Sequence, residues 1–146
     1  MPERTVFQSI SQRHVVNIAP SATIYKAACV MTSANCGSVL VIDGDHGLIG
    51  ILTERDLMTR VIAKSVDPQT TKVADIMTRA PYCVPPETKV TDAVVIMIER
   101  GFRHLPIVTA QNKILGVFSV RDALPREISN AASIAEFHEQ VNDALG

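Results

Sequence analysis

Two seven-residue stretches of this chain carry the same chemically useful side chains in the same order. Residues 50–56 read GILTERD and residues 116–122 read GVFSVRD. In each stretch an apolar run ends at Thr or Ser, and an Asp follows three residues later. A Thr or Ser at a helix start accepts a hydrogen bond from an N–H of the first turn, and an acid three positions on can return one. Each stretch is therefore predicted to turn a strand into a helix. We call residues 53–56 the first corner and residues 119–122 the second corner.

Such a corner can also bind an anion, because a helix N-terminus offers unpaired N–H groups and the positive end of the helix dipole. The guanidinium of Arg55 or Arg121 suits a phosphate. The carboxylate of Asp56 or Asp122 can accept hydrogen bonds from both hydroxyls of a ribose, as an acid does in dinucleotide-binding folds. Capping alone, worth about 1 kcal/mol, explains one such turn. Capping does not require the Arg-Asp pair, so its recurrence favours a nucleotide.

The corners belong to a longer internal repeat. Sliding the chain by 66 residues places residues 5–58 on residues 71–124 without a gap. Few residues are identical, but the apolar pattern agrees along the whole length, as expected of a tandem of two similar units. A half of about 60 residues would be marginally stable alone, so the two halves are expected to depend on each other.

Each repeat is predicted to form a β-α-β-β-α unit, which makes the chain an α+β protein. β-branched runs bounded by turn residues predict strands, and apolar residues at helical spacing predict helices. In the first repeat these are an opening element at 7–11, a strand at 15–18, a helix at 24–34, strands at 38–42 and 48–52, and a helix from Thr53. In the second repeat they are 73–78, 82–84, 90–100, 105–108, 114–118 and a helix from Ser119.

The central helix of each repeat has a predictable end. Thr23 is a good N-cap for the first helix, whereas its counterpart Lys89 is a poor one. Asn35 and Gly101 lie just after the last helical residue. Both residue types tolerate the left-handed conformation that ends many helices.

The predicted organisation also includes a linker and a tail. In the tail, Ser133 and Glu136 match a capping box, which predicts an amphipathic helix that packs on the body or on another subunit. The boundaries are 1–64 for the first unit with its lead-in, 65–72 for the linker, 73–124 for the second unit and 125–146 for the tail. The apolar face of the tail helix is Ile134, Phe137, Val141, Ala144 and Leu145.

Composition excludes several classes of protein. The net charge is −1, the pI is about 6.4, Trp is absent and aromatics make up 4% of the 146 residues, so nucleic-acid binding is not expected. No apolar run approaches the roughly 20 residues of a membrane span, and residues 1–14 have no signal-peptide pattern. Three cysteines without a CxxC pair suit a reducing compartment. A cytoplasmic protein is therefore expected.

Other chemistry is not supported by the spacing of reactive residues. The four histidines make no grouping with metal-ligand spacing, so no metal site is expected. No nucleophile, base and orienting group occur together, so no catalytic residue is assigned and the chain is not expected to be an enzyme.

Taken together, these features resemble a tandem pair of CBS (cystathionine β-synthase) domains, a Bateman module, of the stand-alone bacterial type. The resemblance covers residues 5–124. It rests on the two corner stretches, on GSVLVID and RHLPIV before them, and on VADIMT at 73–78.

The resemblance implies two units in pseudo-twofold tandem, with their sheets packed together and helices outside. Two clefts between the units would bind adenosyl ligands such as AMP, ADP, ATP, NAD or S-adenosylmethionine, with no other cofactor required. It further implies a homodimer that signals to an unidentified partner protein. A ligand-free dimerisation module is the alternative.

The resemblance also assigns site residues. Asp56 and Asp122 would hold the ribose. Thr53 and Ser119 would approach the phosphate, with Arg55 and Arg121 close by. The backbone of Val16, Ile18, Tyr82 and Val84 would meet the adenine edge. Arg103 and His104 would reach phosphate, whereas the first repeat has Gly37 and Ser38 there, so the two clefts are expected to differ in charge.

Overall fold

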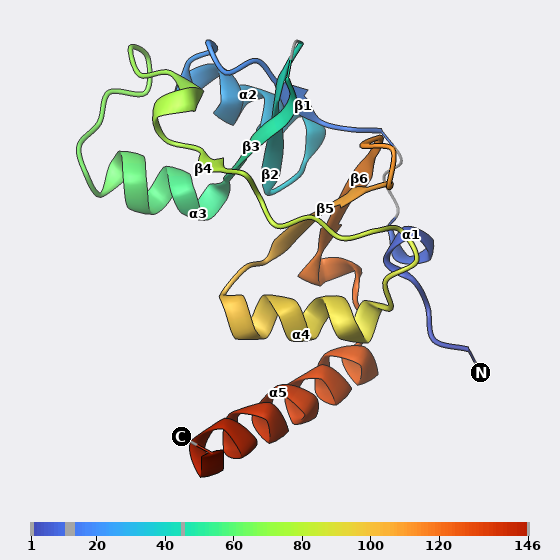
Figure 1. Cartoon of the computed structure of the whole chain (residues 1–146). Helices are drawn as coiled ribbons and strands as arrows, with labels where there is room; N and C mark the ends of the chain where they lie inside the picture. The colour runs from blue at the N-terminus through green and yellow to red at the C-terminus, as the bar shows by residue number, and fades with distance from the viewer. Residues whose placement is uncertain (1, 11–13, 45, 146) are drawn as a thin grey trace. The chain divides into compact units, whose positions relative to one another are not determined.

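The computed structural model describes residues 2–10, 14–44 and 46–145, and the chain divides into two compact units. One unit is Val15–Pro81, which we call the first-repeat unit. The other combines Met1–His14 with Tyr82–Gly146, and we call it the second-repeat unit. Sheets and helices occur in both (Figure 1), which confirms the α+β class.

The first-repeat unit is built on a four-stranded sheet in the order β1-β2-β3-β4, in which β1 and β2 are parallel and the other pairs antiparallel. A helical stretch follows β3 directly, so the strand turns into a helix at the first corner as predicted. Its elements are β1 (Asn17–Ile18), α2 (Ile24–Ala34), β2 (Ser38–Asp43), β3 (Gly47–Thr53), α3 (Glu54–Asp56), a π-helical segment (Leu57–Ile62), a 3₁₀ turn (Val73–Asp75) and β4 (Thr78–Arg79).

The second-repeat unit is built on the antiparallel hairpin β5-β6. The predicted strand at 82–84 is reduced to one parallel bridge between Val84 and Ile107. This bridge matches the pairing of Ile18 with Val41 in the other unit. The elements are α1 (Val6–Ser9), α4 (Val90–Arg100), β5 (His104–Val108), β6 (Ile114–Ser119), a 3₁₀ turn (Val120–Asp122) and α5 (Pro125–Leu145).

The predicted bounds of both central helices are confirmed. Asn35 and Gly101 end α2 and α4 in the left-handed region, with φ of 53° and 76°. The Thr23 side chain accepts from the Lys26 N–H at 3.1 Å, whereas Lys89 makes no side-chain cap. Two different residues thus solve the same backbone problem at the helix end.

The opening element of each repeat packs in the unit of the other repeat. In the second-repeat unit, the Val6 N–H donates to the Thr88 carbonyl at 2.8 Å. In the first-repeat unit, the Val73 N–H donates to the Ala22 carbonyl at 2.8 Å. These bonds are equivalent, yet the donors lie 67 residues apart and the acceptors 66.

The gapless register is therefore wrong in the opening elements by one residue. With the corrected register, the fully buried Val6 corresponds to the fully buried Val73, not to Lys72. Ile10 likewise corresponds to the buried Met77. The extra residue follows from burial, because an apolar side chain must fill the same place under the central helix of each unit. Ser11 and Arg13, which the gapless alignment also used, lie outside the described residues.

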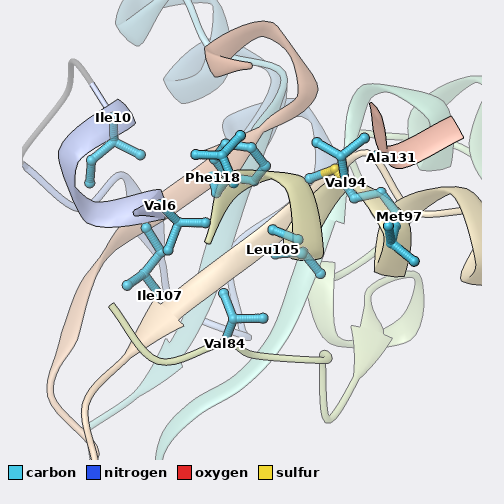
Figure 2. Close-up of a cluster of buried hydrophobic side chains, with 12 residues drawn as sticks. Val6, Ile10, Val84, Val94, Met97, Leu105, Ile107, Phe118 and Ala131 are labelled. Atoms are coloured by element: carbon cyan, nitrogen blue, oxygen red, sulfur yellow. The ribbon is translucent and has the colours of Figure 1, made fainter. Parts of the chain in front are cut away.

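Each unit has its own buried apolar cluster. Figure 2 shows the cluster of the second-repeat unit, where Phe118 of β6 lies among side chains of β5, α4 and α1. Its counterpart in the other unit is Leu52, which is also fully buried. Gly50, two residues before it, has no room for a side chain, because a Cβ would lie 2.4 Å from the Met77 sulfur.

The tail forms the predicted helix, but its predicted start at Ser133 is wrong. The helix α5 begins at Pro125, and the Ser133 hydroxyl donates to the Ser129 carbonyl inside it at 3.2 Å. Proline suits the first position of a helix because it has no N–H to leave unpaired. The side chain of Glu127 accepts from the Leu124 N–H at 2.8 Å, so an acid caps this start from inside the helix.

The helix α5 packs along α4 through small residues (Figure 1). Ala131 is fully buried and Ala135 nearly so. The apolar face predicted for the tail does not pack on the body; Phe137 is 62% exposed and Leu145 is 83% exposed. Among the described residues, no helix has both the length and the apolar character needed to cross a membrane.

Candidate functional site

The first corner is a complete capping box. The Thr53 hydroxyl accepts from the Asp56 N–H at 3.2 Å, and the Asp56 carboxylate accepts from the Thr53 N–H at 2.9 Å through Oδ2. The other carboxylate oxygen, Oδ1, lies 3.7 Å from Arg60 Nε one turn further along. Arg55 is exposed. The helix then continues for six more residues as the π-helical segment, so this corner has a regular helix behind it.

The second corner makes the same box but not the same helix. Asp122 Oδ2 accepts from the Ser119 N–H at 2.9 Å, and the Ser119 hydroxyl accepts from the Arg121 N–H at 3.4 Å. After one 3₁₀ turn the chain becomes extended at Ala123, with φ −84° and ψ 147°. The helix predicted from Ser119 is therefore interrupted. Pro125 accounts for this, because a proline disfavours helical geometry in the residue before it.

The Asp122 carboxyl is half-buried, and this burial raises its pKa. Hydrogen bonding from the Ser119 N–H and the nearby charges of Arg121 and Arg4 act in the opposite direction. Within the described part of the chain, the box uses one carboxylate oxygen of Asp122, and the second oxygen accepts no hydrogen bond. A carboxylate with one oxygen fixed and one available is suited to accept from a ligand hydroxyl.

Predicted phosphate-side residues of the second repeat gather at this corner. His104 pairs with Ser119 across the β5-β6 hairpin, and the Val120 N–H donates to the Arg103 carbonyl at 3.2 Å. The Arg103 and Arg121 side chains are exposed. One end of the hairpin therefore combines a hydroxyl, a carboxylate, an imidazole and two guanidinium groups.

An aromatic pair lies at the end of α4 that leads into β5. The Arg100 guanidinium lies 4.5 Å from the centre of the Tyr82 ring, and the Tyr82 and Phe102 rings are 6.4 Å apart. Tyr82 was predicted for its backbone only. Arg100 and Phe102 were not singled out from the sequence; their position directly before RHLPIV was the available signal.

The remaining predicted adenine-edge residues serve the sheets. Val84 is buried; its N–H donates to the Pro106 carbonyl and its carbonyl accepts from the Val108 N–H, both at 2.9 Å. In the first-repeat unit, the Val16 carbonyl accepts from the Leu40 N–H at 3.0 Å. Ile18 is buried in β1.

The first corner lacks the charged neighbours of the second. The Glu54 N–H donates to the Gly37 carbonyl at 3.0 Å, as Val120 does to Arg103, and the buried Ser38 pairs with Thr53. Side chains thus differ where the backbone is equivalent. The counterparts of the aromatic pair and its arginine are Val16, Cys36 and Ala34.

Other site chemistry is not indicated by the geometry. In residues 2–10, 14–44 and 46–145, no group of three His, Cys, Asp or Glu side chains could hold a metal ion. The three cysteines are free thiols, and burial raises the pKa of the Cys83 thiol. A raised pKa disfavours the thiolate, which is the reactive form.

Comparison with known proteins agrees with this arrangement. The CBS domain matches the chain twice, at residues 7–63 and 73–127. A 17.7 kDa protein of Acidianus ambivalens is 38% identical over 118 residues, which cover 81% of this chain and 70% of that protein. The CBS-domain containing protein ATU1752 of Agrobacterium tumefaciens has a similar structure, with a TM-score of 0.73, 28% identity, and coverage of 81% of this chain and 94% of that one.

A third protein shares the fold at lower identity. The CBS domain protein PAE2072 of Pyrobaculum aerophilum, whose structure is a complex with AMP, has a TM-score of 0.77 and 21% identity, with coverage of 89% of this chain and 99% of that one. The double match to the family covers most of the residues described above, including both corners. This chain is a member of the CBS domain family and carries the domain as a tandem pair.

Proposed function

We propose that the chain is a regulatory module that binds an adenine nucleotide at its corners and signals to a partner protein. The second corner carries the proposal, because Asp122 lies there with Ser119, Arg103, His104 and Arg121 at one end of a single hairpin. Relatedness to PAE2072, which was crystallised with AMP, supports an adenosyl ligand of the AMP, ADP, ATP or NAD type.

Each group has a role that its chemistry allows. The free oxygen of Asp122 accepts from the ribose hydroxyls, since a carboxylate is an acceptor for two donors. Ser119 and the arginines bind the phosphate, to which guanidinium groups donate in bidentate fashion. The Tyr82 and Phe102 rings offer an apolar surface beside these groups for the adenine. The nucleotide acts as an effector and is not consumed.

At the first corner, Asp56 and Thr53 repeat the ribose and hydroxyl groups, and Arg55 adds a cation. Gly37 and Ser38 supply no charge where the second corner has Arg103 and His104. We therefore propose that the first corner binds the same class of ligand more weakly, with a preference for fewer phosphates.

Calorimetric titration with AMP and ATP tests the proposal. Asp122→Asn keeps an acceptor for the Ser119 N–H and removes the charge, so it should weaken AMP binding by about 10-fold or more, as expected for a lost charged hydrogen bond. Glu136→Gln, an exposed acid of α5, is the matched control and should bind as the wild type does. Wild-type affinity in both Asp122→Asn and Asp56→Asn would refute the assigned roles.

A second candidate function is a dimerisation module without a ligand. The observation in its favour is the exposed apolar row on α5 that includes Phe137 and Leu145. Thermal unfolding with and without adenosyl ligands separates the two functions, because a ligand of the native state raises its stability by mass action. No shift with any adenosyl ligand, together with a dimer in sedimentation, would favour this second function.

A further inference from the structure

One arginine from the start of the chain contacts both the second corner and the helix that follows it. Arg4 lies just before α1, in the N-terminal segment of the second-repeat unit. Its guanidinium donates to the Asp122 backbone carbonyl at 3.0 Å. It also forms a two-point ion pair with Glu127, with Arg4 Nε 3.2 Å from Oε2 and Nη2 2.7 Å from Oε1.

This ion pair is placed where it constrains the backbone. Glu127 is only 7% exposed and Arg4 is 31% exposed. Glu127 also accepts from the Leu124 N–H, so it holds the first turn of α5 while Arg4 holds the last residue of the corner. A buried ion pair adds little net stability because both charges lose water. Its effect here is to fix the three residues between Asp122 and α5 in one geometry.

The first corner achieves a related link in a different way. Arg60, on the helical stretch that continues from the corner, lies 3.7 Å from the Asp56 carboxylate and donates to the Ile76 carbonyl at 2.8 Å. The sequence counterpart of Arg60 is Arg126, which is exposed and makes no such contact among the described residues. The interrupted helix after Asp122 moves Arg126 out of position, and Arg4 occupies the role from the opposite end of the chain.

We infer that Arg4 is a positioning residue for the nucleotide site at the second corner, acting through the backbone of Asp122 and the start of α5. This inference rests on the proposed function. It assigns a share of the site to the N-terminal segment, which neither corner motif includes. It also makes the geometry of Asp122 and the docking of α5 depend on the same guanidinium, so ligand and helix are linked through one side chain.

Site-resolved titration by NMR tests this. AMP is titrated into the ¹⁵N-labelled full chain, and affinity is taken from the amide signals of residues 119–122, with those of residues 53–56 as the internal reference. Arg4→Ala should weaken AMP at the second corner by about 10-fold, as a lost hydrogen bond to a charged group would. It should leave the reference corner unchanged. Arg126→Ala removes the same charge without the contacts and is the matched control, expected to bind as the wild type does.

A second variant separates positioning from simple stability. Arg4→Met with Glu127→Leu replaces the ion pair by apolar side chains, an exchange that is often neutral or stabilising. It should recover the melting temperature lost in Arg4→Ala while AMP stays weak. Recovery of both melting temperature and affinity would overturn the inference, as would equal affinity in Arg4→Ala and Arg126→Ala.

The carboxyl titration of Asp122 is a readout that needs no ligand. The charge of Arg4 lowers the pKa of Asp122, so the measured pKa should rise in Arg4→Ala and stay unchanged in Arg126→Ala. If AMP moves no signal at the second corner of the wild type, the proposed function fails there. The titration then decides alone: a raised pKa supports the positioning of Asp122 by Arg4, and an unchanged one overturns it.

Discussion

The two corners have the same backbone and different surroundings. Each closes a capping box from its Thr or Ser to its Asp, and in each the next N–H donates to the residue that precedes the facing strand. Beyond the backbone they differ: the first corner continues into a helix and faces Gly37, while the second stops after one turn and faces Arg103.

This difference separates what capping requires from what a ligand requires. Capping fixes one Asp oxygen in each corner and is satisfied in both. The additional arginines and the imidazole at the second corner contribute nothing to capping, so their presence on one side only is the strongest indication of a binding role. Symmetry of the fold does not imply symmetry of function.

The largest test of the comparison concerns the two cores. Leu52→Ala and Phe118→Ala remove equivalent, fully buried side chains, and each should lower the free energy of unfolding by about 3–4 kcal/mol. Urea unfolding followed by circular dichroism measures this. Because each unit contains the opening element of the other repeat, we expect one shared transition. Two separate transitions, each shifted by one variant only, would show that the units unfold independently.

Acid should separate Glu127 from Asp122. Hydrogen bonding to Arg4 holds the pKa of Glu127 below its usual value of 4.5. Its stabilising effect is therefore present above that value and is lost as the pH falls through the lower folded-state pKa. Burial raises the pKa of Asp122, so its ionisation opposes folding, and this cost disappears as the pH falls through its raised folded-state pKa.

Glu127→Gln should accordingly lower the free energy of unfolding at pH 7 by about 1–2 kcal/mol, a moderate loss because Arg4 is partly exposed to water. The loss should shrink as the pH falls below 4.5, the usual pKa of a Glu. Urea unfolding at a series of pH values measures it, with Glu139→Gln on the exposed side of α5 as control. A difference from wild type that is the same at every pH would contradict the ion pair.

The smallest effects are expected at the ends of α2 and α4. Gly101→Ala places a Cβ at φ 76° and should cost about 1 kcal/mol. Gly101→Asn copies the other repeat, where Asn35 adopts φ 53°, and should cost about half as much. Thermal unfolding of the two variants measures the difference. Equal losses would show that the strain at this position is unrelated to side-chain type.

Local signals in the sequence predicted the elements that each repeat contains. Apolar spacing and the left-handed residues Asn35 and Gly101 gave the bounds of α2 and α4, because those bounds depend on neighbours within a few residues. The two corners could be predicted for the same reason. Reading the pattern twice, once in each repeat, made each element clearer than a single copy would.

Contacts between distant residues could not be predicted in this way. Arg4 and Glu127 are 123 residues apart in the sequence, and no local pattern connects them. The start of α5 was placed too late because Ser133 and Glu136 match a capping box, while the actual start depends on Pro125 and on Glu127. The one-residue shift of the opening elements was also hidden, since it appears only when Val6 and Val73 are compared by burial.

The reciprocal packing of the opening elements bears on how such a chain could arise. A single ancestral repeat would carry its opening segment on the wrong side to complete its own sheet and helix. It could close only by lending that segment to a second molecule and receiving one in return, as in a domain-swapped pair. Gene duplication and fusion would then turn an exchange between two molecules into one within a single polypeptide, removing its dependence on concentration and freeing the two halves to diverge.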